Sequence, residues 1–181
     1  GKWHLGTLSQ AVRDGHRGGR EKFVSEYSPP WENGFDVCFS TEQAVPTWDP
    51  MKDQTIPTQY WEGPGRVATN NLEGDDSRVI MDRAIPFIEK SVREQRPFLS
   101  VIWFHAPHTP VVAGPTYLDM YAGFDEDRRH YYGCITAMDE QIGRLRKILR
   151  SLGVEENTLI FFVSDNGPAG EGGGILQHPG Q

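Results

Sequence analysis

The chain has 181 residues, enough for one domain of ordinary size, and carries a formal net charge of -7. The acidic balance and the lack of a long basic stretch argue against nucleic acid or an anionic membrane surface as a partner, and no apolar run is long enough to cross a bilayer. The two cysteines, Cys38 and Cys134, lie in no CxxC pattern, so we expect two buried free thiols.

The chain opens with GKWHLG, residues 1–6. If this stretch is extended, Lys2 and His4 point to one face and Trp3 to the other. One interpretation is a strand end with Trp3 in the core, where Lys2 and His4 form an anion clamp with an imidazole for proton transfer. The alternative is a buried tryptophan with two solvated neighbours. These six residues alone leave both interpretations open.

Residues 7–70 are rich in Gly, Pro and Trp and show little periodicity, which indicates either substrate-facing loops or partial disorder. Within them, FDVCF (35–39) is expected to form a short strand. The aromatic residues favour ordered loops, in which the rings form small cores or stack on carbohydrate: Trp31, Trp48, Tyr60 and Trp61.

Two amphipathic helices are predicted further along the chain. The first covers residues 77–95, with capping residues from Asp75 onward and with Pro86 expected to kink it or delay its start. The second covers about 129–152, with Gly153 as the residue that ends it. The apolar stripes are Ile80, Ala84, Ile88 and Val92 in the first helix, and Ile135, Met138, Ile142, Leu145, Ile148 and Leu149 in the second.

Each predicted helix is followed by an apolar run that is typical of a buried strand, FLSVIWF (98–104) and TLIFFVS (158–164). The order helix, strand, helix, strand predicts an α/β fold, in which helices flank a layered, mostly parallel sheet. In this interpretation residues 71–181 form the core of the fold, and residues 7–70 form a loop-rich segment beside it.

The first apolar run leads into HAPHTP (105–110), at a strand end where α/β sheets gather their ligand sites. Pro107 and Pro110 hold the backbone around His108 rigid, which suits the mounting of a catalytic imidazole. The alternative is a simple surface turn. His105 is the weaker candidate, because the end of a strand can bury it.

The second apolar run leads into SDNGP (164–168). Asp165 and Asn166 place two oxygen donors side by side at the strand tip, a combination that suits calcium or magnesium. Gly167 and Pro168 are expected to turn the chain away. The alternative is an Asx turn that closes the strand.

In this order and at these separations, GKWHLG, APHTP and SDNGP resemble the sulfatase family of the alkaline-phosphatase superfamily. The likeness extends to NGFDVCF, to the helix 131–153 and to the strand 158–167, and so touches nearly the whole chain. The resemblance implies an alkaline-phosphatase-like α/β fold and a sulfuric ester hydrolase. Its substrate would be a sulfate ester, with a sulfated polysaccharide as one candidate, and its location would be exported, periplasmic, extracellular or lysosomal.

The resemblance also implies a role for each motif residue. Lys2 would bind a sulfate oxygen and help to hold the nucleophile, and His4 would assist proton removal from it. His108 would bind sulfate and aid departure of the leaving group. Asp165 and Asn166 would coordinate a divalent cation, usually calcium (Ca2+).

The likeness stops at the nucleophile. The family makes a formylglycine from Cys or Ser in a C/S-x-P-x-R segment, and neither Cys38 nor Cys134 lies in such a segment. In the family this segment and two metal-binding aspartates precede GKWHLG, and a second sulfate-binding lysine follows SDNG, whereas the last lysine here is Lys147. We therefore expect a central fragment of a sulfatase catalytic domain. Its formylglycine would lie upstream and would be installed by a formylglycine-generating enzyme or an anaerobic maturase.

The same residues are compatible with two other functions, a phosphodiesterase or phosphonate hydrolase of the same superfamily and a non-catalytic binder of sulfated glycans. The chain by itself is expected to show no sulfatase turnover and to bind calcium weakly, because donors are missing. It is also expected to expose Trp103, Phe161 and Phe162, since sheet strands that would cover them are absent.

Overall fold

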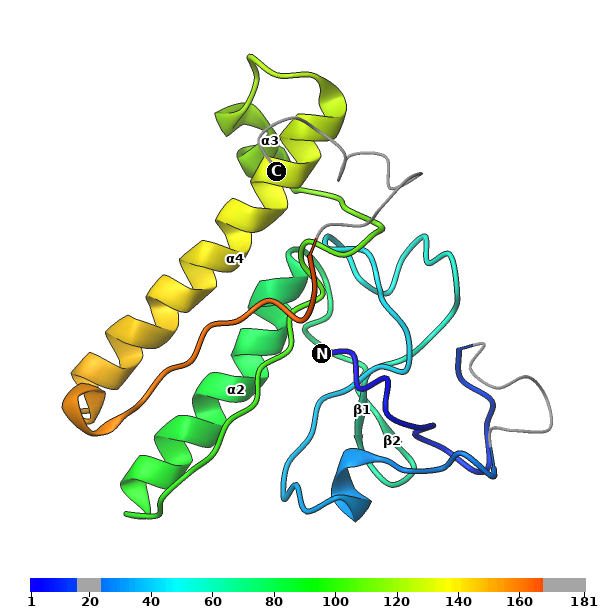
Figure 1. Cartoon of the computed structure of the whole chain (residues 1–181), viewed down its shortest axis with the longest axis vertical. Helices are drawn as coiled ribbons and strands as arrows, with labels where there is room; N and C mark the ends of the chain where they lie inside the picture. Colours follow the sequence, from blue (N-terminus) through cyan, green and yellow to red (C-terminus); the bar gives the residue numbers. More distant parts are fainter. Residues whose placement is uncertain (16–23, 168–181) are drawn as a thin grey trace.

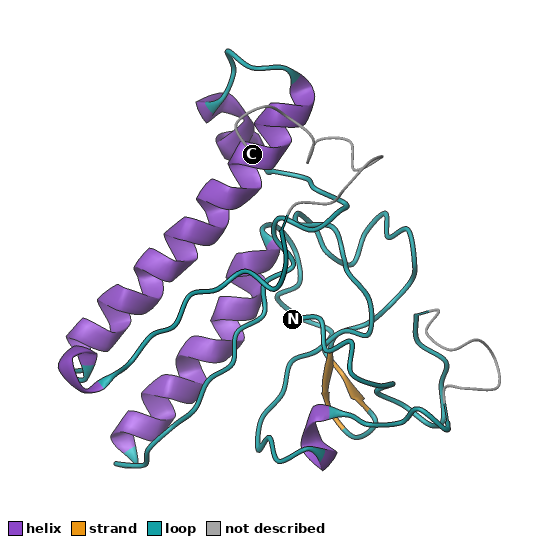
Figure 2. Ribbon diagram, in the orientation of Figure 1, coloured by secondary structure: helices purple, strands orange, loops and turns teal. Residues whose placement is uncertain are grey.

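The computed structural model describes residues 1–15 and 24–167 of the chain. Two long helices, α2 (Asp76–Arg93) and α4 (Glu126–Ser151), lie side by side and run in the same direction (Figure 1). A small sheet and most of the loops lie on one flank of α2 (Figure 2). Among the described residues, none of the helices is long and apolar enough to span a membrane.

Helix α2 begins and ends within two residues of its predicted bounds. Asp75 caps it, because its carboxylate accepts a hydrogen bond from the backbone N–H of Arg78 at 3.0 Å. Pro86 lies inside the helix on its exposed side and does not delay its start. Of the predicted stripe, Ile80 and Ile88 are buried, whereas Ala84 and Val92 are only half-buried. The buried face is wider than predicted and adds Val79, Met81 and Ile85.

The wide buried face of α2 follows from its two packing partners. On one side, α2 packs against α4, where Arg144 donates to the Asp82 carboxylate at 2.5 Å. On the other side, Val79 and Ile80 pack into a core cluster with loop residues. The other members of that cluster are Tyr60 and Ala68, with Phe39, Met51, Leu72, Ile102 and Phe104 packed against it.

Helix α4 confirms the second predicted helix, although it begins three residues earlier, after the capping residue Asp125. Gly153 follows it with a φ of 70°, the left-handed conformation expected of a residue that ends a helix. Only Leu149 of its predicted stripe is fully buried. The short helix α3, Pro115–Met120, was not predicted and packs on α4, where Gly133 leaves room for Ala113 and Tyr117.

The sheet among the described residues is a two-stranded antiparallel pair, β1 (Trp61–Gly63) and β2 (Arg66–Val67), which was not predicted. Isolated bridges join it to earlier segments, with Ser40 antiparallel to Trp61 and Lys2 parallel to Thr41. The predicted strand over 35–39 is wrong. Pairing begins only at Ser40, which forms a bridge with Trp61, and continues at Thr41, which forms a bridge with Lys2. Two single 3-10 turns, η1 (Pro30–Glu32) and η2 (Glu155–Asn157), complete the regular structure of residues 1–15 and 24–167.

The two apolar runs are not paired strands, and the prediction that both are buried is wrong. Within the described part of the chain, residues 98–104 and 158–164 carry no strand assignment, and Leu99 and Phe161 are 78% and 80% exposed. The expectation that Trp103, Phe161 and Phe162 are exposed is confirmed, at 41%, 80% and 68%. An apolar run is typical of a strand that is packed on both faces, but the elements that pack against it come from other parts of the fold. The run by itself therefore does not determine whether it is buried.

Both cysteines are free thiols, as predicted, but only Cys134 is fully buried, and Cys38 is half-buried. Burial raises the pKa of Cys134 to about 12 and that of Cys38 to about 11. Both side chains are therefore neutral at physiological pH and act as packing groups.

Candidate functional site

The start of the chain is fixed by a short parallel ladder. The backbone N–H of Thr41 donates to the Gly1 carbonyl at 3.1 Å, and the Trp3 N–H donates to the Thr41 carbonyl at 2.9 Å. Trp3 is buried, as predicted, and its indole N–H donates to the Ser28 carbonyl at 2.6 Å. Its ring packs 5.7 Å from the ring of Trp103. GKWHLG is thus anchored in the core through its tryptophan.

Lys2 and His4 flank this anchor but differ in environment. Lys2 is half-buried beside Thr41, whereas His4 is exposed and has a φ of 51°. The extended conformation therefore ends at His4, and the simple alternation of faces stops there. A shared face for the Lys2 and His4 side chains stays a prediction.

In HAPHTP, the two histidines have opposite environments. His105 is buried, whereas His108 is exposed. The His108 backbone N–H donates to the His105 carbonyl at 2.6 Å, which closes a tight turn. His108 Nδ1 lies 2.6 Å from the Thr109 carbonyl, and because a carbonyl only accepts, Nδ1 carries the proton. In the neutral ring Nε2 is then the nitrogen that takes up a proton.

Thr47 fastens the loop that follows His108 to the start of α2. Its hydroxyl donates to the Val112 carbonyl at 2.6 Å and accepts from the Val112 N–H at 2.8 Å. The Thr47 N–H donates to the Pro110 carbonyl at 3.2 Å, and the Asp76 N–H donates to the Thr47 carbonyl at 3.1 Å. These four bonds fix the backbone on the C-terminal side of His108.

Four buried side chains, Thr41, Tyr60, Asp76 and His105, form one hydrogen-bonded group, which we call the His105 network. The Tyr60 hydroxyl donates to Asp76 Oδ1 at 2.5 Å, and His105 Nδ1 lies 2.7 Å from Asp76 Oδ2. On its other side, His105 Nε2 lies 3.1 Å from the Thr41 hydroxyl. Burial and the neighbouring Asp76 charge raise the pKa of Tyr60 well above its usual value, so its hydroxyl keeps its proton and donates.

The sequence indicated only part of this network. In the sequence, Asp76 is one of the capping residues expected from Asp75 onward, and His105 is the histidine that the end of a strand can bury. Thr41 and Tyr60 carried no signal of a polar role. The hydrogen bonds that join the four residues span 16 to 64 positions in the sequence, and no local spacing predicts such bonds.

The structure brings GKWHLG and HAPHTP together in space. A Cβ placed on Gly1 would lie 1.6 Å from the Trp103 carbonyl oxygen, so the start of the chain is in direct contact with the run that leads to HAPHTP. Thr41, the ladder partner of Lys2, contacts His105, whose carbonyl holds the His108 N–H. Two motifs that are about a hundred residues apart thus share one anchored region.

SDNGP is not joined to that region by any hydrogen bond among the described residues. Asp165 and Asn166 are exposed, and the Asn166 side-chain amide donates to the Gly167 carbonyl at 2.6 Å. Pro168, which was expected to turn the chain away, lies outside the described residues.

The donor set for a metal ion is incomplete in the part of the chain that the structure describes. Asp165 and Asn166 offer oxygen donors of the kind that calcium prefers, but calcium takes about six to eight oxygen ligands. Residues 1–15 and 24–167 contain no group of three or more His, Cys, Asp or Glu side chains that could hold a metal ion. The chemistry of the two donors fits calcium, whereas their number does not.

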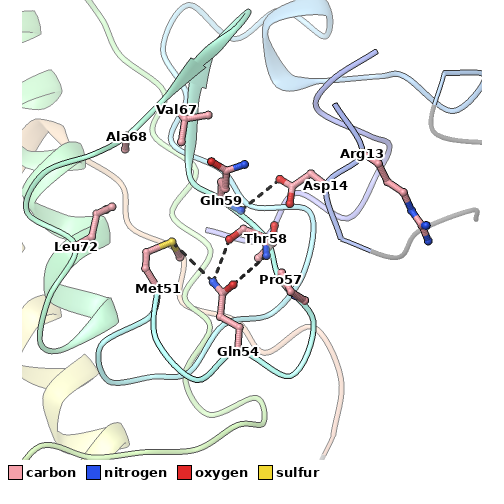
Figure 3. A pocket seen from close by; sticks show the side chains of 10 residues that line it. All are labelled: Arg13, Asp14, Met51, Gln54, Pro57, Thr58, Gln59, Val67, Ala68 and Leu72. Carbon is pink, nitrogen blue, oxygen red and sulfur yellow. Dashed lines mark hydrogen bonds between the residues drawn. The ribbon is translucent and has the colours of Figure 1, made fainter. Parts of the chain in front are cut away.

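The structure also contains a pocket of about 520 Å³ (Figure 3). Asp14 Oδ2, on one wall, accepts from the Trp61 indole N–H at 2.6 Å, and burial raises the pKa of this carboxyl. The Gln54 side chain bonds to Thr58 through both its amide oxygen and its amide nitrogen. The lining residues are Arg13, Asp14, Met51, Gln54, Pro57, Thr58, Gln59, Val67, Ala68 and Leu72, and they include none of the predicted site residues.

Comparison with known proteins identifies the family. The family model described as Sulfatase matches residues 1–181, the whole chain. The chain is 29% identical to N-acetylgalactosamine-6-sulfatase of Canis lupus familiaris, over 91% of this chain and 31% of that protein. It is 30% identical to an ulvan-active sulfatase of Formosa agariphila, over 92% of this chain and 32% of that protein. The chain belongs to the sulfatase family and spans about a third of the length of these relatives.

Solved structures support the same fold. The crystal structure of Ps i-CgsB matches with a TM-score of 0.61 at 20% sequence identity, over 75% of this chain and 32% of that one. A second crystal structure of Ps i-CgsB, in complex with k-i-k-neocarrahexaose, matches with a TM-score of 0.59 over the same shares of the two chains. The family and these structural neighbours support an alkaline-phosphatase-like α/β fold.

Proposed function

We propose that the protein containing this chain is a sulfuric ester hydrolase that cleaves a sulfate ester of a carbohydrate. The observation that carries the proposal is the convergence of GKWHLG and HAPHTP, which places Lys2 and His108 on two segments that are fastened to each other. Family membership and the names of the two relatives support the reaction class and the sulfated carbohydrate.

The chemistry assigns a role to each of these side chains. Cleavage of a sulfate ester builds negative charge on the bridging oxygen and on the transferred sulfate. The Lys2 ammonium would bind a sulfate oxygen, and protonated His108 would pass the proton at Nε2 to the leaving oxygen. His4, at the point where the extended segment ends, would take a proton from the nucleophile. We further propose that a formylglycine outside this chain supplies the nucleophilic hydroxyl.

Asp165 and Asn166 are proposed as two of several ligands to a calcium ion. The Asp165 carboxylate and the Asn166 amide oxygen are hard donors of the right type. When bound, the ion would stabilise negative charge on the sulfate group. In the complete protein, Asp165→Ala should weaken calcium-dependent thermal stabilisation, whereas Asp53→Ala, which removes another exposed carboxylate, should leave it unchanged.

The exposed apolar runs support a further structural proposal. We expect 98–104 and 158–164 to be strands of a mostly parallel sheet, flanked by helices, whose remaining strands lie outside this chain. Their exposed apolar side chains support this expectation, since a sheet strand that is covered on both faces is apolar almost throughout.

Turnover of 4-nitrophenyl sulfate and 4-nitrophenyl phosphate by the complete protein tests the function. We expect hydrolysis of the sulfate and a loss of at least about a hundredfold in kcat for Lys2→Ala, the order found when a group that stabilises charge is removed. Lys52→Ala is the matched control, since Lys52 is an exposed lysine paired with Asp49. Faster turnover of the phosphate would favour the phosphoryl-transfer alternative. Sulfate turnover that survives Lys2→Ala would contradict the proposed site.

A further inference from the structure

The His105 network lies where the two motif segments meet, and each of its ends is attached to one of them. At one end, Thr41 is the ladder partner of Lys2: its N–H and its carbonyl bond to the residues on either side of that lysine. At the other end, the carbonyl of His105 accepts the N–H of His108. A continuous series of side-chain hydrogen bonds therefore links the residue that pairs with the Lys2 segment to the residue that holds the His108 backbone.

The network also reaches the other support of the His108 loop. Asp76 accepts from Tyr60 and His105 through its side chain, and its backbone N–H donates to the Thr47 carbonyl. Thr47 in turn holds Pro110 and Val112 through its N–H and its hydroxyl. The start of α2 is thus a common anchor for both sides of the loop that carries His108.

A group of this kind is a costly way to fill a core. The Asp76 and His105 side chains are buried. Removing ionisable groups from water costs free energy, and this cost is offset only when the groups form hydrogen bonds of good geometry. Apolar side chains of similar volume often stabilise a core as well or better. What a fully bonded polar group adds is a single fixed geometry, because each partner has one position that satisfies all the bonds.

We propose that the His105 network is a positioning unit, in which Thr41, Tyr60, Asp76 and His105 hold Lys2 and His108 in register with each other for attack on the sulfate group. This inference rests on the proposed sulfatase function. None of the four side chains is placed in contact with substrate, so they are positioning residues and not catalytic ones. A displacement of the Lys2 segment relative to the His108 loop lowers stabilisation of the transition state more than it lowers substrate binding.

The test compares two substitutions at Thr41 in the complete protein. Thr41→Val removes the hydroxyl that faces His105 Nε2 and keeps the branched shape, whereas Thr41→Ser keeps the hydroxyl. We expect kcat for 4-nitrophenyl sulfate to fall by about tenfold or more in Thr41→Val, with KM changed less than about twofold, and to return close to the native value in Thr41→Ser. Tyr60→Phe should behave like Thr41→Val, because it removes the other terminal hydroxyl.

Two control variants separate positioning from a general loss of stability. Tyr117→Phe removes a tyrosine hydroxyl that donates to a carboxylate, Glu140, at 2.6 Å and lies outside the network. Thr136→Val removes a threonine hydroxyl that donates to the Tyr132 carbonyl within α4 and also lies outside the network. We expect both controls to keep kcat within about twofold of the native value. A kcat that is unchanged in Thr41→Val and Tyr60→Phe, or lowered equally in all four variants, would overturn the proposal.

Amide hydrogen exchange gives a readout that does not depend on turnover. In Thr41→Val and Tyr60→Phe, exchange should speed up together in the peptides that cover 39–43 and 105–110, and the Tyr117→Phe control should leave both unchanged. If the native protein hydrolyses no sulfate ester, the proposed function fails, and exchange alone decides whether the network couples the two segments. If sulfate is hydrolysed and the two peptides respond independently, the positioning proposal fails while the function stands.

Discussion

The two apolar runs of this chain have similar compositions and very different surroundings in the structure. Residues 98–104 and 158–164 are each apolar almost throughout, and each leads into a polar motif. In the first run, Ile102 and Phe104 pack against the core cluster of α2, and the motif beyond it is fixed by the His105 network and by Thr47. In the second run, Leu159 to Val163 are exposed, and the motif beyond it makes only local hydrogen bonds among the described residues.

The difference shows that an apolar run does not fix its own burial. The first run is held by groups from α2, from the segment around Thr41 and from the start of the chain, which all lie within this sequence. The second run meets no such partners in the described part of the chain. The position of a motif is therefore fixed here by hydrogen bonds from polar groups that are distant in sequence, and not by the apolar run that precedes it.

The largest expected effect concerns the motif of the anchored run. His108→Ala in the complete protein should lower kcat by a hundredfold or more, because it removes a group proposed to bind sulfate and to protonate the leaving oxygen. Steady-state kinetics on 4-nitrophenyl sulfate measure this effect. Thr109→Ala is the control: it lies next to His108 and keeps the carbonyl that His108 Nδ1 contacts. A His108→Ala variant within a few-fold of the native rate would remove His108 from the site.

The next effect concerns the stability of the anchored run. Phe104→Ala in the 181-residue chain should lower the free energy of unfolding by about 2–3 kcal/mol, since Phe104 packs against the core cluster that includes Val79 and Ile80. Urea unfolding followed by tryptophan fluorescence measures the change. A loss below about 0.5 kcal/mol would mean that this run is no better anchored than the second one.

A third effect concerns pH and the common anchor at the start of α2. Burial, partly offset by the hydrogen bond from the Arg78 N–H, raises the pKa of Asp75 to about 6. The native state then binds more protons than the unfolded state between about pH 4 and pH 6, so stability falls as the pH rises through this window. Asn is also a good N-cap, and it carries no titrating charge.

We therefore expect Asp75→Asn to be more stable than the native chain above pH 6, by roughly 1–2 kcal/mol after the lost attraction between the carboxylate and the helix dipole is taken into account. The difference should vanish near pH 4. Unfolding free energies at pH 4 and pH 7.5 check both parts of this expectation. A variant that is less stable than the native chain at pH 7.5 would show that the ionised Asp75 carboxylate stabilises the folded state.

The smallest expected effect concerns the second run. Phe161→Ala in the 181-residue chain should change the free energy of unfolding by less than about 0.5 kcal/mol, because an 80% exposed side chain loses little packing when it is truncated. The same urea experiment measures it beside Phe104→Ala. If the two substitutions cost the same, the second run is covered by the chain itself, and the contrast between the two regions disappears.

The sequence by itself determined the features that depend on neighbouring residues. The bounds of α2 and α4 follow from apolar periodicity together with Asp75 at one start and Gly153 at one end, signals that act within one helical turn. The burial of Trp3 follows from a large apolar ring in an extended segment. The order of GKWHLG, HAPHTP and SDNGP was enough to indicate the sulfatase family, to which the chain belongs.

Only the tertiary structure decided which distant groups meet. The pairing of Lys2 with Thr41, the burial of His105 against Asp76 and the hairpin of β1 and β2 all depend on contacts made when the chain folds back on itself. The same holds for packing. The composition of 98–104 and 158–164 indicates that both runs need packing partners, and within the described residues only the first run packs against the core cluster. Hydrogen bonds and packing act over a few ångströms in space, so residues that are far apart in sequence carry no local signal of them.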